Sequence, residues 1–360
     1  MPIPPLADHF EEQAGWCDQL GSPFTASLLH ALKADLETDG VLADLLETWP
    51  TNPRADALGL RLAGALHNAV LTGKSEALAE VYPAEGRDWD MEIVWPVADD
   101  FLINNKAWVM DFIQMPPQTN ETRRAFMMLM GLKEIARRFE RPVHLLELGA
   151  SAGLNQNFDA FYYDAGSWQW GDATSPMKVT TEWNGPAPDL SAPLLIHERK
   201  ACDQNPLDLS DMTTRLRVKS YIWADQPERL ARFDAAAAIA IARHTKVEKA
   251  DAADWIEREL AARPDGMTTV VFHSVFFQYP PIEIRNRITQ TIEATGTSET
   301  TETPLVWLRY EPETLWTRNK EIHAANMACD LRIWPGDEHV TLAKSDGHVR
   351  EVFASGFKAR

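Results

Sequence analysis

The stretch that most constrains the fold runs from His144 to Asn155 and reads His-Leu-Leu-Glu-Leu-Gly-Ala-Ser-Ala-Gly-Leu-Asn. An apolar run after Pro142 carries one acidic residue, Glu147, and then enters a turn of small residues that opens a helical pattern. Small residues at such a turn let another group approach the backbone, and the N–H groups at a helix start face that space. Open α/β sheets bind ligands at the carboxyl ends of their strands. The stretch therefore predicts a buried strand, a tight turn and a helix beside a ligand-binding edge.

Strand-like runs recur between helical segments throughout the rest of the chain. They are Leu194–Ile196 with its continuation, Val247–Ala250, Thr268–His273 and Pro304–Tyr310. Alternation of strands with helices of ten or more residues indicates parallel βαβ units. Near the end, Val340–Ala343 and His348–Phe353 flank Asp346-Gly347, which is a hairpin turn signal. The pattern predicts an α/β fold, a Rossmann-like doubly wound sheet with a C-terminal antiparallel hairpin.

The first third of the chain shows no such strand series. Residues 6 to about 82 carry apolar side chains at helical spacing, for example Leu28, Leu29, Leu32 and Leu36. Residues 82–117 are rich in Trp, Asp and Pro and predict irregular structure with a short helix. We therefore expect an all-helical N-terminal domain over residues 1–117 and the sheet domain over residues 118–360.

Charge and composition restrict the partners. A net charge of −18 argues against broad binding to phosphate backbones, so a small-molecule substrate is expected and no nucleic acid. The most apolar run, Ala235–Ala242, is far shorter than the ~20 residues of a membrane span. Cys17, Cys202 and Cys329 are isolated, which predicts neither a metal site nor a disulfide framework. With no apolar signal core at the N-terminus, a cytoplasmic location is expected, and nothing indicates an oligomeric state.

The glycine turn admits several interpretations. It lacks the dinucleotide fingerprint G-x-G-x-x-G, because positions 151 and 154 hold Ser and Leu. It fits the G-x-S-x-G elbow of serine hydrolases, with Ser151 as nucleophile and with Asp residues and then His273 or His348 following in triad order. The elbow normally follows several strands, however, and the region before residue 140 is helical in pattern. Packing alone also explains a strand-to-helix turn of small residues.

A further interpretation is the first motif of class I methyltransferases, which the turn resembles. That motif is a strand ending in an acidic residue followed by G-x-G-x-G, and here Ser151 replaces the middle glycine. The resemblance implies an S-adenosylmethionine site. The residues expected to contact the cofactor at the turn are Glu147, Gly149, Ala150, Ser151 and Gly153.

Carboxylates near the ends of the next two strands complete this hypothesis. Asp203 stands where a ribose-binding residue is expected, although it lies about fifty residues beyond Gly153, compared with roughly twenty in dinucleotide sites. Glu198 is the alternative. Asp251 is a candidate for binding the adenine amino group, with Ala252 against the ring, but Asp251 also suits a helix cap.

The fourth strand ends at His273-Ser274, followed by Phe-Phe-Gln-Tyr-Pro-Pro after Val275. This edge is expected to face the transferred methyl group, so His273 is the candidate base and Tyr279 a candidate pocket wall. A purely structural role for His273 is equally compatible with the sequence.

Motifs spread over nearly the whole chain resemble an uncharacterised bacterial family, domain-of-unknown-function family 2332. They are Gly21-Ser-Pro-Phe24, Gly64-Ala-Leu-His67, Leu71-Thr-Gly73, Gln118-Thr-Asn-Glu121 with Arg124, Glu147 to Asn155 with Asp159 and Tyr162, Asn205-Pro-Leu-Asp208, Phe272-His-Ser274 and Asp346-Gly-His348. The resemblance implies no known reaction, but the family's central motif is similar to that of class I methyltransferases. By analogy with that fold, Asn120 and Glu121 are expected to line the cofactor pocket.

Together these features predict an S-adenosylmethionine-dependent methyltransferase with a small-molecule acceptor. Two alternatives stay open from the sequence. One is a serine hydrolase with Ser151 as nucleophile, and the other is a non-catalytic protein that binds S-adenosylmethionine or a nucleotide.

Overall fold

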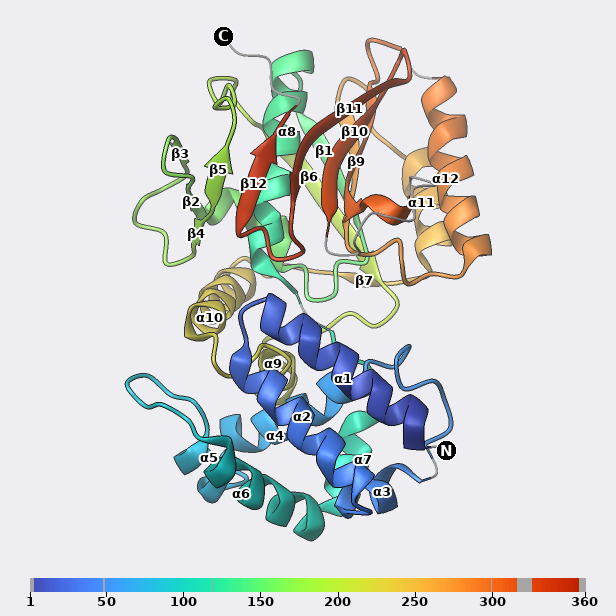
Figure 1. Ribbon diagram of the computed structural model, residues 1–360. Helices are drawn as coiled ribbons and strands as arrows, with labels where there is room; N and C mark the ends of the chain where they lie inside the picture. Colours follow the sequence, from blue (N-terminus) through green and yellow to red (C-terminus); the bar gives the residue numbers. More distant parts are fainter. Residues whose placement is uncertain (1–2, 48, 119, 299, 316–325, 356–360) are drawn as a thin grey trace. The chain divides into compact units, whose positions relative to one another are not determined.

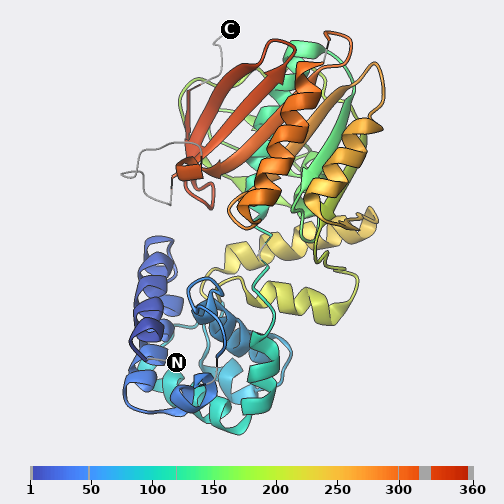
Figure 2. The same ribbon diagram turned by 90° about the vertical axis from the view of Figure 1, so that its right-hand side faces the viewer.

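The computed structural model describes residues 3–47, 49–118, 120–298, 300–315 and 326–355 (Figures 1 and 2). The chain forms two compact units. The helical unit comprises Met1–Thr119 with Leu209–Phe233, and the sheet unit comprises Asn120–Asp208 with Asp234–Arg360.

This division differs from a single cut after residue 117, because the segment Leu209–Phe233 belongs to the helical unit. The contacts of that segment explain the difference. Tyr221 is buried in the helical core. Its ring packs directly on Gly64, because a Cβ atom added to Gly64 would lie only 2.7 Å from Tyr221 Cδ1. Asp225 accepts hydrogen bonds from the Ser22 hydroxyl at 2.5 Å and from the Phe24 N–H at 3.0 Å.

The helices of the helical unit pack around one apolar core. They are α1 (Ile3–Gln19), α2 (Pro23–Glu37), α3 (Val41–Leu46), α4 (Leu58–Leu71), α5 (Glu76–Val81), α6 (Met91–Asn104), α7 (Lys106–Ile113) and α9 (Met212–Ser220). The predicted stripe on α2 is buried, and Ser22 caps this helix with Pro23 following it. Much of residues 82–117, expected to be irregular, forms α6 and α7, since the buried Val94, Ala98 and Leu102 give α6 an apolar face.

The sheet unit contains a nine-stranded, mostly parallel sheet in the order β5-β12-β11-β10-β9-β8-β1-β6-β7. The parallel part is formed by β1 (Val143–Leu148), β6 (Ile196–Asp203), β7 (Glu248–Lys249), β8 (Thr268–Ser274) and β9 (Leu305–Pro312). Numbered along the chain, these five strands lie in the order 3-2-1-4-5, which places the first strand at the centre. The four strand runs predicted after β1 correspond to β6, β7, β8 and β9.

An antiparallel series continues the sheet from β9. It comprises β10 (Met327–Trp334), β11 (Glu338–Ser345) and β12 (Glu351–Ala354), and the short β5 (Glu182–Asn184) pairs parallel with β12 at the edge. The predicted C-terminal antiparallel pair is therefore present as β11 and β12. The strand β10 was not predicted, because it carries charged residues whose charges are paired within the fold, Asp330 with Arg309 and Arg332 with Asp337.

Helices cover the two faces of the sheet. The helix α8 (Ala125–Phe139) packs on β9 and β10, with Gly131 directly over Leu308. On the other face, α11 (Ala252–Ala261) and α12 (Ile282–Thr297) lie side by side (Figure 2). Trp307 is buried in the core that these helices form with the sheet. Leu308 and Trp307 are neighbours on one strand, so their side chains point to opposite faces. The remaining helix, α10 (Pro227–Ala242), contains the point in the sequence, between Phe233 and Asp234, at which the chain passes from the helical unit to the sheet unit.

The Trp-rich insertion between β1 and β6 forms a separate small sheet in the order β3-β2-β4. Its strands are β2 (Tyr162–Asp164), β3 (Gln169–Trp170) and β4 (Lys178–Thr180). In the described residues, no helix is both long and apolar enough to cross a lipid bilayer.

Gly131 tests how tightly α8 packs on the sheet. A Cβ atom at this position would lie 2.4 Å from Leu308 Cδ1, inside a fully buried layer. We expect Gly131→Ala to destabilise the sheet unit by about 1–3 kcal/mol through overpacking, offset by at most about 1 kcal/mol of helix propensity. Urea unfolding monitored by circular dichroism measures the change.

The matched control is Gly15→Ala on α1, where an added Cβ atom meets nothing within 4 Å. Here only helix propensity acts, so the variant should be more stable than the wild type by up to about 1 kcal/mol. Equal shifts in the two variants would show that α8 does not need the glycine.

Candidate functional site

The turn after β1 is as tight as its small residues predict. Gly149, Ser151 and Gly153 all have left-handed backbone conformations, with φ of +67°, +54° and +69°. A Cβ atom on Gly149 would lie 2.2 Å from Cδ2 of Phe276, and one on Gly153 would lie 2.9 Å from side-chain atoms of Thr245 and Val247. Both glycines are therefore required by conformation and by space, whereas Ser151 adopts a backbone region uncommon for a residue with a side chain.

The helix expected after the turn is not a regular α-helix. The segment η2 (Leu154–Ala160) is a 3-10 helix of seven residues, and Asn157 within it departs from helical geometry. Its side chains bond across to other segments, since Asn157 Nδ2 donates to the Thr245 hydroxyl at 2.9 Å. The predicted role of an α-helix N-terminus in binding an anion or cofactor is therefore not supported.

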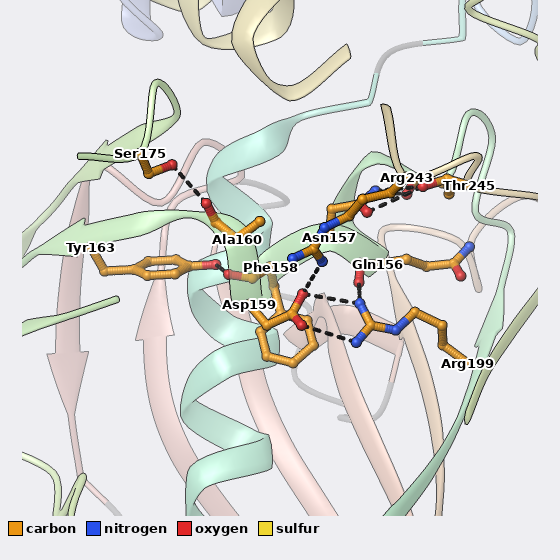
Figure 3. Close-up of polar contacts among 11 residues, drawn as sticks. Gln156, Asn157, Phe158, Asp159, Ala160, Tyr163, Ser175, Arg199, Arg243 and Thr245 are labelled. Carbon is orange, nitrogen blue, oxygen red and sulfur yellow. Dashed lines mark hydrogen bonds and ion pairs between the residues drawn. The ribbon is translucent and has the colours of Figure 1, made fainter. Parts of the chain in front are cut away.

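An ion-pair network fixes η2 in place (Figure 3). Asp159 accepts two hydrogen bonds of 3.0 Å from Arg199 on β6 and one of 2.6 Å from Arg243. Arg199 also donates to the Gln156 carbonyl at 2.6 Å. Burial alone would raise the pKa of Asp159, but the hydrogen bonds and charges of the two arginines lower it below its ordinary value. This carboxylate is thus a structural anchor for the segment after the turn.

Three predicted carboxylates stand at or just beyond the carboxyl ends of adjacent parallel strands. Glu147 lies near the end of β1, Asp203 ends β6 and Asp251 follows β7. The Ala250 N–H donates to the Asp203 carbonyl at 3.0 Å, which ties the end of β7 to that of β6. The structure therefore places these side chains along one edge of the sheet.

Asp203 and Asp251 each have structural contacts of their own. Asp203 accepts hydrogen bonds of 2.8 Å from the backbone N–H groups of Ser151 and Asn205, so it braces the glycine turn. Asp251 caps α11 by accepting from the N–H groups of Ala253 and Asp254, as its alternative interpretation anticipated. Ala252 packs into the core between the sheet and α11.

Glu147 has a different environment. Only 4% of this residue is exposed, and its Oε2 atom has no hydrogen-bond partner among the described residues. Burial, and secondarily the charge of Asp203, raise the pKa of Glu147 to about 8. This carboxyl is therefore mainly protonated at neutral pH.

Further polar atoms around the turn share this lack of partners. Within the described residues, the buried atoms near the turn without a hydrogen bond are Glu147 Oε2, Ser151 Oγ, Asn155 Oδ1, Gln156 Nε2 and Asn120 Oδ1. Leaving a buried polar group unpaired costs roughly 1–3 kcal/mol each. A cluster of such atoms beside a ligand-binding edge indicates that a ligand or ordered water supplies the missing bonds.

The segment before α8 contributes to the same cluster. Asn120 Nδ2 donates to the Ala150 carbonyl at 2.9 Å, so this predicted residue does contact the turn. Glu121 is buried and caps the short 3-10 helix η1 (Thr122–Arg124) by accepting from the Arg123 N–H. Position 119 of the same motif lies outside the described residues.

The prediction of His273 as a catalytic base is contradicted by its surroundings. The side chain is completely buried, and Nδ1 lies 2.6 Å from Glu311 Oε1. The indole N–H of Trp307 donates to Nε2 at 2.9 Å. With Nε2 accepting and Nδ1 donating, neither ring nitrogen is available to a substrate.

Tyr279 is not a pocket wall either, because it is 73% exposed on the loop after β8. Aromatic contact with the turn comes instead from Phe276 three residues earlier. The sequence singled out the right loop but the wrong residues. The sequence could have indicated Phe276 as an aromatic residue just before the Tyr-Pro-Pro turn. It could have indicated Glu311 as an acidic residue directly after the apolar residues of β9.

The hydrolase interpretation lacks its base. Ser151 Oγ has no hydrogen-bond partner in the described part of the chain, and His273 is held by Glu311 and Trp307. A nucleophilic serine needs a base within hydrogen-bonding reach to accept its proton.

Among the described residues, no group of three or more His, Cys, Asp or Glu side chains is arranged to hold a metal ion. A cavity of about 10 Å³ lies in the helical unit, lined by residues that include Phe24, His67, Tyr82 and Tyr221. It has room for about one water molecule.

Comparison with known proteins gives one match. The model of domain-of-unknown-function family 2332, described as an uncharacterized protein conserved in bacteria, matches residues 7–353. No curated protein and no solved structure matches the chain.

The raised pKa of Glu147 predicts a measurable pH dependence of stability. In the unfolded chain this carboxyl loses its proton near its ordinary value of 4.5, whereas the folded protein keeps it up to about 8. The contribution of Glu147 to stability is therefore largest below pH 4.5 and falls as the pH rises to about 8. Relative to Glu147→Gln, the wild type should lose on the order of 2–4 kcal/mol of unfolding free energy between pH 5 and pH 8.

Urea unfolding at several pH values, with the two proteins compared at each, isolates this group from all others that titrate. The control is Glu283→Gln, which changes an exposed carboxyl on α12. A constant difference between wild type and Glu147→Gln over this range would contradict the assignment of a proton to Glu147.

Proposed function

The chain belongs to this uncharacterised bacterial family, and we propose that it is an S-adenosylmethionine-dependent methyltransferase acting on a small-molecule acceptor. The observation that carries the proposal is the row of three carboxylates, Glu147, Asp203 and Asp251, around a glycine turn at one sheet edge. A cofactor built from an amino acid, a ribose and an adenine offers hydrogen-bond donors for each of them.

The strand order supports the same proposal. The sequence 3-2-1-4-5 of parallel strands is that of doubly wound nucleotide-binding sheets, whose ligands bind where the order reverses beside the first strand. In this chain that position lies between β1 and β8, where Gly149 meets Phe276. We therefore interpret the sheet unit as a Rossmann-like, methyltransferase-type domain, whose antiparallel series β10-β11-β12 is larger than the expected hairpin.

The side chains at the turn fit the proposed cofactor. Glu147 Oε2 and Ser151 Oγ are buried without partners, so a ligand that binds them gains hydrogen bonds that the protein alone leaves unmade. Glu147 would bind the amino group of the methionine portion, and Asp203 the ribose hydroxyls. Asp251 and Ala252 are proposed for the adenine, with Asp251 keeping its role as helix cap.

When bound, S-adenosylmethionine supplies an electrophilic methyl group on a positively charged sulfur. The chain's own contribution is then mainly to orient the two reactants and exclude water, which is sufficient for a direct displacement. His273 takes no part in proton transfer, because both its nitrogens are engaged. The net charge of −18 favours a small acceptor over a nucleic acid.

Calorimetric titration with S-adenosylmethionine and S-adenosylhomocysteine tests the proposal. We expect dissociation constants near 10 μM, about −7 kcal/mol. Asp203→Asn keeps an oxygen for the Ser151 N–H but loses the charge, so it should bind about tenfold more weakly. Gly149→Arg, which would collide with Phe276, should abolish binding.

The control for Gly149→Arg is Gly166→Arg. Gly166 also has a positive φ, +72°, but an added Cβ atom there meets nothing within 4 Å. This variant should bind like the wild type. A folded wild-type protein that binds neither compound would remove the proposal.

Turnover is a separate question from binding. Binding without methyl transfer to any member of a broad panel of small acceptors would favour the alternative of a non-catalytic S-adenosylmethionine-binding protein.

A serine-directed phosphonate distinguishes the hydrolase alternative. Because Ser151 Oγ has no hydrogen-bond partner among the described residues, we expect no covalent adduct on this residue by mass spectrometry after prolonged incubation. A stoichiometric adduct that is lost in Ser151→Ala would instead make hydrolysis the leading function.

A further inference from the structure

Phe276 and Glu311 are two residues at the carboxyl edge of the sheet that the proposed function does not use. We propose that the Phe276 ring is a movable cover over the glycine turn, which the ligand must displace, and that Glu311 is the positioning residue that fixes the backbone carrying this ring. The inference rests on the proposed function, since it concerns the same site.

The ring occupies the space that a ligand needs beside Gly149. A Cβ atom on Gly149 would lie 2.2 Å from Cδ2, 2.7 Å from Cγ and 3.0 Å from Cε2 of Phe276. The absent side chain of the glycine is thus replaced by an aromatic ring from another strand's loop. No ligand can lie against this part of the backbone while the ring is there.

The neighbouring ring shows what a fixed aromatic residue looks like in this loop. Phe277 is buried and stacks on His273, with ring centroids 4.8 Å apart and an angle of 13° between the planes. It also contacts the Trp307 ring edge to face. Phe276 contacts the His273 ring edge to face, with ring centroids 5.9 Å apart, but it is only half-buried, so part of its side chain faces outward, unlike that of Phe277.

Glu311 holds the backbone from which both rings project. Its Oε1 atom accepts hydrogen bonds from the Phe276 N–H at 2.9 Å and the Phe277 N–H at 3.1 Å, and lies 2.6 Å from His273 Nδ1. The Val275 N–H donates to the Tyr310 carbonyl at 2.9 Å. Val275 has a φ of +51°, which a β-branched residue keeps only when its surroundings impose it.

In this arrangement, the hydrogen bonds that hold the loop backbone do not depend on the position of the Phe276 ring. Glu311 and His273 are fully buried, so the two N–H bonds are protected from competing water. Rotation about the Cα–Cβ bond of Phe276 breaks none of them. The ring can therefore leave Gly149 while the loop itself stays in place.

The polar atoms around the turn supply the reason for such a movement. Glu147 Oε2 and Ser151 Oγ have no partner in the described residues, yet they are sealed from solvent. A ligand reaches them only if a covering group moves, and Phe276 is the side chain that lies against the turn from the β8 loop. The closed form thus competes with the ligand, and the apparent affinity falls by the fraction of molecules that are open.

Phe276→Ala tests the cover directly, with S-adenosylhomocysteine as the probe in calorimetry and stopped-flow binding. Removing the ring should tighten binding by roughly tenfold and speed association, because the protein no longer has to open first. Tyr279→Ala is the matched control, since Tyr279 is an exposed aromatic residue on the same loop. It should leave both quantities unchanged.

The role of Glu311 is tested by two quantities that a general loss of stability would not change together, the hydrogen exchange of two amides and the effect of Phe276→Ala on binding. In Glu311→Ala the Phe276 and Phe277 amides should lose their protection from hydrogen exchange, and adding Phe276→Ala should no longer tighten binding. Glu311→Gln, which keeps an acceptor oxygen for the two N–H groups, should restore both properties. If Glu311→Ala fails to fold, the Phe276 and Glu311→Gln measurements still decide.

The outcomes distinguish this inference from the function on which it rests. Wild-type binding that is as tight as that of Phe276→Ala, or tighter, would overturn the cover while leaving the proposed function intact. Failure of every variant, Phe276→Ala included, to bind either S-adenosylhomocysteine or S-adenosylmethionine would overturn both. Measurable binding by the wild type that Phe276→Ala tightens would support both.

Discussion

The pairing of β1 between β6 and β8 is the constraint from which the rest of the sheet unit follows. It places Glu147 level with Ala201 on one side and Phe272 on the other, deep in the sheet. Two contacts to β6 follow the strand end, because the Ala150 N–H donates to the Cys202 carbonyl and the Ser151 N–H donates to the side-chain carboxylate of Asp203. The glycine turn is thus fastened to β6 at two successive residues. These two contacts hold the residues of the turn in their left-handed conformations.

That fastening decides which polar groups remain for a ligand. Asp203 gives one oxygen to Ser151 and the other to Asn205, while Asp251 caps α11. One oxygen of Glu147 has no hydrogen-bond partner in the described chain, and burial favours the neutral form of this carboxyl. At this edge, the carboxylates of Asp203 and Asp251 therefore make structural hydrogen bonds, whereas the carboxyl of Glu147 has one oxygen left for a ligand. A site made in this way binds at the cost of little rearrangement of its own backbone.

The parts of the fold that the sequence predicted are those with a strong local pattern. The apolar runs of β1, β8 and β9 and the leucine stripe of α2 are buried segments whose composition alone indicates burial. The strand β10 was missed because Asp330 pairs with Arg309 and Arg332 pairs with Glu293, partners distant in the sequence that no local pattern contains. The small sheet of β2, β3 and β4 has strands of two or three residues, too short for alternation to be visible.

The same holds for the candidate site, where the sequence indicated the residues that follow from local pattern but not those that depend on contacts between strands. Residues next to the glycine turn or at strand ends, such as Glu147 and Asp203, follow from topology, since carboxyl ends of parallel strands meet at one edge. The role of His273 does not follow, because it depends on Glu311 and Trp307, which lie on the next strand of the sheet. Pairing of side chains across strands is set by register, and register is not written in the local sequence.

Gly149 illustrates both what the local sequence predicts and what only the structure shows. From the sequence, a glycine at this place has two explanations, a backbone approached by a ligand or a backbone approached by the protein itself. The structure shows the second, since the Phe276 ring fills the space. The two explanations are compatible only if the ring can yield that space. A ligand that takes the place of the ring would supply hydrogen bonds to the atoms of the turn that lack partners in the described residues. Packing alone does not explain why the turn that Phe276 contacts carries a carboxyl, a hydroxyl and three amides without hydrogen-bond partners among the described residues.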